Sequence, residues 1–100
     1  MQINITLDQW LFNENGEKQL RTIVQNRFFQ FKSKVKAVDF MIEATPDDLL
    51  SSPLQANCRL TSQDGHKIGM FLGYGQSAEQ ALSNAFAKAF KALVWNNNIE

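Results

Sequence analysis

Apolar and polar residues alternate in four short segments of the chain, which is the pattern of strands with one buried face. In residues 1–7, Ile3, Ile5 and Leu7 lie on one side and polar residues on the other. Similar alternation predicts strands over 37–44, 54–61 and 67–73. The side chains that it places toward the core are Val38, Phe40, Ile42, Ala44, Leu54, Ala56, Cys58, Leu60, Ile68, Met70 and Leu72. Asp64-Gly65, between the last two segments, is typical of a hairpin turn.

The segment between the first two strands has the period of an amphipathic helix. Its apolar residues recur at spacings of three and four, namely Leu20, Ile23, Val24, Phe28 and Phe31. The pattern predicts a helix within 18–36 that is capped by Asn13 or Asn15, with Gly16 in the preceding loop. Trp10, in the same connection, either packs over the end of the core or serves as an exposed stacking platform.

A second helix is predicted after the last strand. Ser77 and Gln80 have the spacing of a capping box, in which the serine side chain caps the first turn. The apolar stripe of this helix comprises Ala81, Leu82, Ala85, Phe86, Ala89 and Leu93, and its outer stripe comprises Gln80, Asn84, Lys88, Lys91 and Trp95. Its small alanines suit close packing against a sheet.

The order of elements is therefore β-α-β-β-β-α. We expect an α+β fold in two layers, with a four-stranded sheet and both helices on one face. Residues 1–95 form a single domain, 96–100 a tail, and 45–53 a surface loop. Gly69 indicates a bulge or a close backbone approach in the fourth strand. The open sheet face would carry Asn4, Thr6, Asp39, Met41, Glu43, Gln55, Asn57, Arg59 and Phe71.

Positive charge is concentrated in residues 18–36. This stretch holds six of the ten basic residues and no acid, so the net charge of zero conceals a strong segregation. On a helical projection, the residues opposite the apolar stripe are Lys18, Arg21, Gln25, Phe29, Lys32 and Lys36, while Arg27 lies nearer the core and extends outward along it. Such a face is either a solvated cationic surface or a surface that meets phosphates.

No pattern in the sequence predicts catalysis, a metal site or a cofactor. His66 lies in the predicted turn, and Cys58 faces the core without a base beside it. Gly73-Tyr74-Gly75 lacks the further glycines and the lysine of a nucleotide-binding loop. The chain has no apolar run of membrane-spanning length, and its N-terminal segment does not have the pattern of a signal peptide. We therefore expect a cytoplasmic protein that is not an enzyme.

Four parts of the sequence carry a resemblance to a known family. They are the opening MQINIT, Leu20-Arg21 followed by Val24, the strand VDFMIEA, and the ending HKIGMFLGYGQSAEQALSNAFAKAFKAL. Together they resemble the ribosome hibernation-promoting factors, also called ribosome-associated inhibitors or sigma-54 modulation proteins. The resemblance covers nearly the whole chain and matches a short form of the family.

This resemblance implies a fold similar to that of double-stranded RNA-binding domains. It also implies binding in the small ribosomal subunit, to rRNA and ribosomal proteins across the channel used by mRNA and tRNA, which idles the ribosome. No membrane or small-molecule substrate is implied. We expect an RNA-binding surface composed of Lys18, Arg21, Gln25, Phe29, Lys32, Lys34, Lys36, Lys88 and Lys91.

Four features depart from the family pattern: the second helix has few bases, the connection from Trp10 to Glu17 is longer, Asp47-Asp48 makes one loop acidic, and the net charge is zero. They leave open an alternative function, a protein-interaction or assembly module of the same fold that has lost ribosome binding. A stand-alone binder of double-stranded RNA is a further alternative. Phe29 on the basic stripe would stack on a base, pack against a ribosomal protein or cover a second copy in a homodimer.

Overall fold

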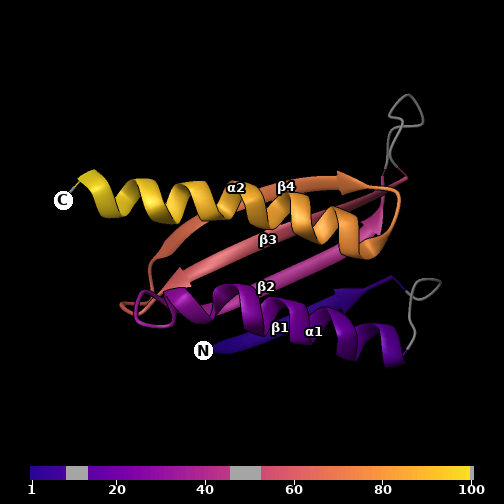
Figure 1. The fold of residues 1–100 in the computed structure, drawn as a ribbon, viewed down its shortest axis with the longest axis horizontal. Coiled ribbons are helices and arrows are strands. Elements are labelled where there is room, and N and C mark those ends of the chain that lie inside the picture. The colour runs from indigo at the N-terminus through magenta and orange to yellow at the C-terminus, as the bar shows by residue number, and fades with distance from the viewer. Residues whose placement is uncertain (9–13, 46–52, 100) are drawn as a thin grey trace.

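The computed structural model describes residues 1–8, 14–45 and 53–99 of the chain. Its elements are β1 (Gln2–Leu7), α1 (Glu14–Phe28), the short 3-10 helix η2 (Phe29–Phe31), β2 (Val35–Ala44), β3 (Leu54–Ser62), β4 (Lys67–Gly75) and α2 (Ala78–Ile99). Figure 1 shows the two helices side by side in front of the sheet.

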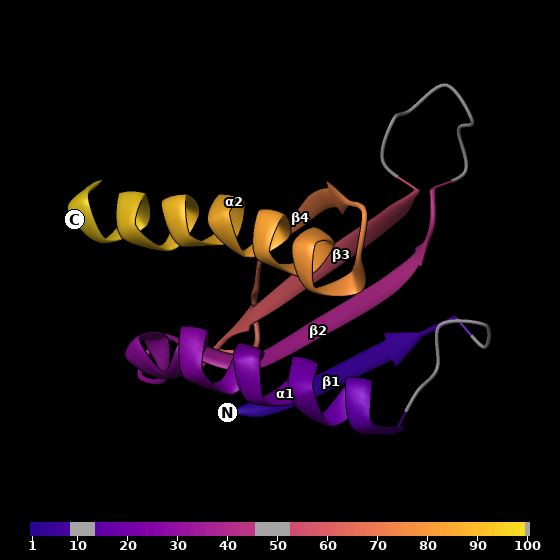
Figure 2. The ribbon, with the colours of Figure 1, turned by 45° about the vertical axis from the view of Figure 1, so that its right-hand side comes forward.

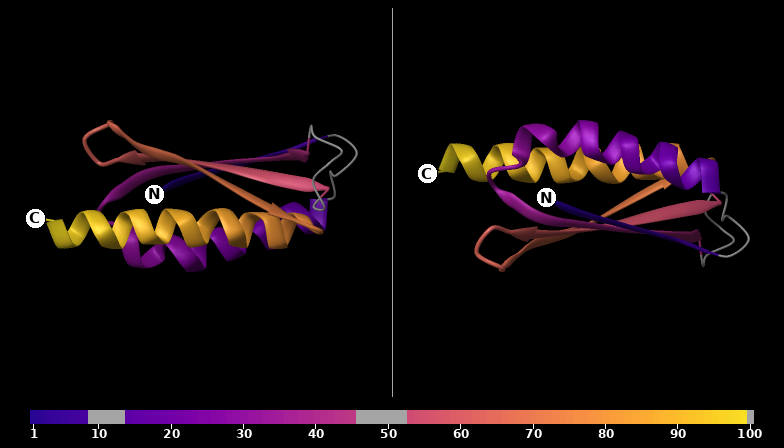
Figure 3. Two further views of the ribbon diagram at one scale, coloured as in Figure 1. Left: turned by 90° about the horizontal axis from the view of Figure 1, so that it is seen from above. Right: turned by 90° about the horizontal axis from the view of Figure 1, so that it is seen from below.

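The four strands form one sheet in the order β1-β2-β3-β4. β1 pairs with β2 in parallel, and the remaining pairs are antiparallel. Both helices cover the same face, as the edge-on views of Figure 3 show. α1 lies over β1, while α2 lies over β3 and β4 (Figure 2). The predicted α+β fold, with two layers and the order β-α-β-β-β-α, is therefore confirmed.

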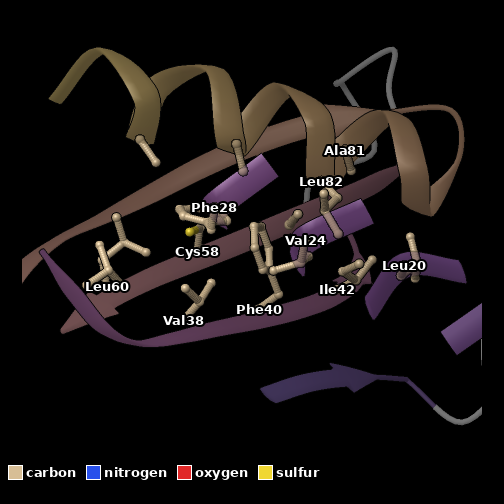
Figure 4. Close-up of a cluster of buried hydrophobic side chains, with 14 of the residues drawn as sticks. Leu20, Val24, Phe28, Val38, Phe40, Ile42, Cys58, Leu60, Ala81 and Leu82 are labelled. Carbon is tan, nitrogen blue, oxygen red and sulfur yellow. The ribbon is translucent and has the colours of Figure 1, made fainter. Parts of the chain in front are cut away.

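The core lies between the sheet and the two helices. Val24 and Phe28 of α1 meet Phe40 and Ile42 of β2 and Leu82 of α2 in its centre (Figure 4). The predicted inward faces of β2 and β3 are buried, with the exception of Ala44 at the end of its strand. Burying apolar surface at roughly 25 cal/mol per Å² makes this cluster the main source of stability.

The predicted orientation of β4 holds for Ile68, which packs against the core, but is wrong for Met70 and Leu72. The register of β4 pairs Phe71 with Cys58, whose side chain faces the core, and pairs Met70 with the outward-facing Arg59. Met70 is consequently 58% exposed, and Leu72 lies opposite the outward-facing Asn57. Phe71 packs against the core and does not belong to the open face.

Glycines on β4 explain this reversal. Gly73 and Gly75 occupy core-facing positions, and a Cβ atom at Gly73 would overlap the backbone of Ala81 and Ala85 in α2. At Gly75 a Cβ atom would lie 2.6 Å from the backbone nitrogen of Ala81. The helix therefore rests directly on the strand backbone, an approach that only glycine permits. The predicted irregularity near Gly69 is confirmed by a register shift between Leu60 and Thr61.

The boundaries of α1 also differ from the prediction. The helix begins at Glu14, so Gly16 lies inside its first turns and Asn15 is not its cap. It ends at Phe28, and a turn over 32–34 leads into β2 at Val35. Lys32 and Lys34 are therefore in a turn, and Lys36 is in a strand. Trp10, Asn13 and residues 46–52 lie outside the described residues.

α2 is well defined by its cap. Ser77 Oγ accepts a hydrogen bond from the backbone N–H of Gln80, and Gln80 Oε1 accepts one from the backbone N–H of Gln76. The serine half of the predicted capping box is thus confirmed, while the glutamine reaches one residue further back. The helix continues to Ile99, whereas the sequence predicted a tail from residue 96.

Candidate nucleic-acid interface

Most of the described basic residues lie at one end of the molecule. α1 and α2 run in the same direction along the longest dimension, which extends 41 Å (Figure 1). Their C-terminal halves, the start of β2 and the β3–β4 hairpin therefore share one end. We call this the basic end, and its cations are Arg27, Lys32, Lys34, Lys36, Lys67, Lys88 and Lys91. The described acid of this end is Asp64, and Asp39 of β2 lines a depression together with Lys67.

The opposite end is acidic. Its acids include Asp8, Glu17, Glu43 and Glu79, and Lys18 lies among them on the second turn of α1. Part of this segregation complements the helix dipoles, since Glu79 lies in the first turn of α2 and Arg27 in the last turn of α1. Lys34, Lys36 and Lys67 are not helical, so the dipoles do not account for the basic end as a whole.

Arg21 is held by structural contacts. Its Nη1 donates a hydrogen bond of 2.7 Å to the backbone carbonyl of Ile3 in β1, and its Nη2 lies 3.2 Å from Glu17 Oε1. In the described parts of the chain, this Arg21–Glu17 contact is the ion pair that the structure shows. Arg21 therefore ties α1 to β1, while its side chain remains 40% exposed.

Arg27 lies between the two helices. Its guanidinium stands 5.6 Å from the centre of the Phe86 ring in α2, and the side chain is half-buried. Phe28 packs edge-on against the same ring at 4.9 Å. A cation over an aromatic face is stabilised by the ring quadrupole. The predicted position of Arg27, beside the core with its charge outward, fits these contacts, and the residue joins the two helices at the basic end.

The β3–β4 hairpin fixes the turn that carries Lys32 and Lys34. The backbone N–H of Gln63 donates to the carbonyl of Lys34, and Gln63 Nε2 donates to the carbonyls of Lys32 and Val35. These bonds use backbone groups and leave both lysine side chains unengaged by them. The turn is thus a rigid support for its cations.

A bulge turns Lys36 outward. The β2–β3 register shifts between Val35 and Ala37, so that Val35 is fully buried and Lys36 is exposed. Thr61 pairs with both Ala37 and Lys67. Lys36 and Lys67 consequently lie near one another at the end of the sheet, two strand spacings or about 10 Å apart in that direction. Sequence reasoning missed Lys67, whose position follows only from this register.

Lys88 and Lys91, the predicted cations of α2, lie on the side of the helix that faces away from α1. Asn84 donates to the carbonyl of Tyr74 in β4, and Lys88 follows it by one turn, whereas Phe86 faces α1. Lys88 and Lys91 are both exposed. The basic end therefore presents cations on several sides, and they do not form the single helical stripe that the sequence predicted. Lys18 lies at the other end of the molecule, and Gln25 is exposed on α1 between them.

Phe29 is 63% exposed, which fits its prediction on the polar side of the first helix. The ammonium group of Lys32 lies 4.4 Å from the centre of its ring. One face of Phe29 is therefore already occupied by a cation of the same chain.

Other chemistry has little support in the described residues. Burial raises the pKa of the Cys58 thiol from 9.0 to about 12, with a further contribution from the charge of Asp39. Such a thiol is unreactive at neutral pH. Within the described ranges, no three His, Cys, Asp or Glu side chains are grouped to hold a metal ion. No helix in the described ranges is both long and apolar enough to cross a membrane.

The chain matches no protein-family model, and no curated protein matches its sequence.

Proposed function

We propose that this chain binds RNA of the small ribosomal subunit through its basic end and keeps the ribosome idle by occupying the channel used by mRNA and tRNA. The observation that carries the proposal is the gathering of seven described cations at one end, none of them within ion-pair distance of a described acid. We choose ribosomal RNA as the ligand because the sequence resembles the hibernation-promoting factors.

Free cations favour phosphate binding because neutralising a phosphate releases its condensed counterions. For five phosphate contacts, a rise in salt from 50 to 200 mM is expected to lower the affinity roughly 10²- to 10³-fold. Lysines that are already paired with acids would contribute little to this effect. The seven cations of the basic end form no ion pair with a described acid, and this supports its role.

The rigidity of the basic end supports recognition of RNA shape. Its cations come from α1, the following turn, β2, β4 and α2, and Gln63 fixes the turn by three hydrogen bonds. Folded RNA is recognised mainly through the positions of its phosphates and hydroxyls. Cations held on several sides of one rigid end fit a cleft between RNA segments.

The acidic end gives the molecule an orientation. With a net charge of zero, the chain has no general attraction for polyanions, but opposite charges at its two ends make it dipolar. In the field of an RNA surface, the basic end turns toward the phosphates and the acidic end away from them. This arrangement favours one docking orientation and suppresses nonspecific binding.

Sedimentation with purified small subunits tests the proposal. We expect the chain to pellet with the subunits at 50 mM salt and to be largely released at 200 mM. The same subunits filled with mRNA and initiator tRNA serve as the control, because an occupied channel should exclude the chain. Failure to pellet at low salt, or equal pelleting with filled subunits, would reject binding in the channel.

A second candidate is a protein-interaction module of the same fold. The open sheet face exposes Met41 and Met70, by 44% and 58%, and flexible methionines are common at adaptable protein contacts. In this case Met70→Gln would weaken association with the partner, and the low-salt pelleting with ribosomal subunits would be absent.

A further inference from the structure

The C-terminal half of α2 carries an exposed aromatic surface. Trp95 is 68% exposed, Phe90 38% and Val94 37%. Together with Lys91 and Ala92 they line a shallow depression of about 670 Å³. Large aromatic side chains that remain in water on a helix mark a surface where something binds.

The fold leaves this surface uncovered. The α1 region reaches this part of α2 through the edge-on packing of Phe31 against Phe90, at 5.7 Å between ring centres. Beyond Phe90, α2 continues for two further turns to Ile99. The β3–β4 hairpin twists away from this part of the helix, as the views from above and below show (Figure 3). Neither layer of the fold therefore packs over Trp95.

The charge around the aromatic surface is positive. Lys91 lines the depression and Lys88 lies one turn before it, while α2 contains no acid after Glu79 in its first turn. A symmetric pairing of two copies through this surface would place two positively charged patches against each other. A binding partner with planar apolar rings and negative charge is complementary to it, and unpaired RNA has both.

We infer that Trp95, with Lys91 beside it, is a stacking platform for an unpaired nucleotide of the bound RNA, a role that rests on the proposed function. Every nucleobase has a face that stacks on an indole ring, and the adjoining phosphate is within reach of a neighbouring lysine. Phe29 is less suited, because Lys32 already covers one face of its ring. Among the described residues, Trp95 has no aromatic or cationic contact of this kind.

Two probes separate stacking from charge. We would measure the affinity of the full chain for a 12-nucleotide oligoadenylate and for inorganic polyphosphate of the same length, at 50 mM salt. Trp95→Ala is expected to weaken oligoadenylate binding about tenfold and to leave polyphosphate binding unchanged. Lys91→Gln is expected to weaken both. Trp95→Phe, which keeps an aromatic face, should retain most of the oligoadenylate affinity.

Several results would overturn the platform. They are an oligoadenylate affinity unaffected by Trp95→Ala, equal losses for both probes, or no binding of oligoadenylate by the wild-type chain. A dimer that becomes a monomer on Trp95→Ala, seen by size-exclusion chromatography, would assign the surface to a second copy. If the wild-type chain pellets with small subunits but Trp95→Ala changes neither probe, the platform fails and the proposed function stands. If the wild-type chain does not pellet, the proposed function itself fails.

Discussion

Arg21 Nη1 donates a 2.7 Å hydrogen bond to the backbone carbonyl of Ile3, so an arginine of the basic stretch fastens α1 to β1. Replacing it by Ala removes this charge-assisted bond and the contact with Glu17, and the free energy of unfolding should fall by about 2 kcal/mol. Urea denaturation measures the change. Lys18→Ala, an exposed residue three positions earlier on α1, is the matched control and should cost less than about 0.5 kcal/mol. Equal stability of the two variants would contradict the role of Arg21.

The contact of Gly73 with α2 makes a second prediction. A Cβ atom there would overlap the backbone of Ala81 and Ala85, which cannot move without lifting the helix from β4. Gly73→Ala should therefore lower the free energy of unfolding by about 3 kcal/mol. Thermal unfolding, followed by circular dichroism, checks this value.

Gly65→Ala, in the β3–β4 hairpin, is the control for the loss of stability expected of Gly73→Ala. The φ of Gly65 is +87° and no atom lies within 4 Å of the position that a Cβ atom would take, so alanine there strains the backbone without a collision. Gly65→Ala should cost about 1 kcal/mol. If Gly65→Ala proved more costly than Gly73→Ala, close packing of α2 on β4 would not be the reason for the glycine.

The buried thiol of Cys58 predicts a pH dependence of stability. The thiol ionises near pH 9.0 in the unfolded chain, whereas burial raises its pKa to about 12 in the folded one. Above pH 9 the unfolded state therefore holds fewer protons, and the free energy of unfolding falls as the pH rises. From pH 8 to pH 10, the wild-type chain should lose about 1.4 kcal/mol more than Cys58→Ala. Urea denaturation of both proteins at these two pH values measures the difference, and parallel losses would show that the thiol titrates normally.

The alternation of apolar residues predicted β1, β2 and β3 because each strand has one face toward the core and one face toward solvent. It failed for β4 beyond Ile68, where Gly69, Phe71, Gly73 and Gly75 face the core and Met70 and Leu72 face outward. A hydrophobicity pattern cannot recognise a glycine as buried when its role is to admit a helix backbone. The fold class survived this error because strand order and helix placement do not depend on the orientation of β4.

The candidate site was predictable in composition but not in shape. The excess of bases in residues 18–36 is a property of the sequence, and it indicated a cationic surface. The sequence could not show that the helix ends at Phe28, that Arg21 turns to Ile3, or that a bulge exposes Lys36. Lys67 joins the basic end through long-range strand pairing, which no local pattern records.

Charge reversal at the two ends of the molecule tests RNA binding by the basic end most directly. Lys36→Glu and Lys18→Glu change the net charge equally, and both lysines are exposed, but Lys36 lies at the basic end and Lys18 at the acidic end. In sedimentation with small ribosomal subunits at 50 mM salt, Lys36→Glu should lower the affinity about tenfold and reduce the slope of log affinity against log salt by about one. Lys18→Glu should change the affinity less than about twofold. Equal losses for the two variants, or a greater loss for Lys18→Glu, would contradict binding through the basic end.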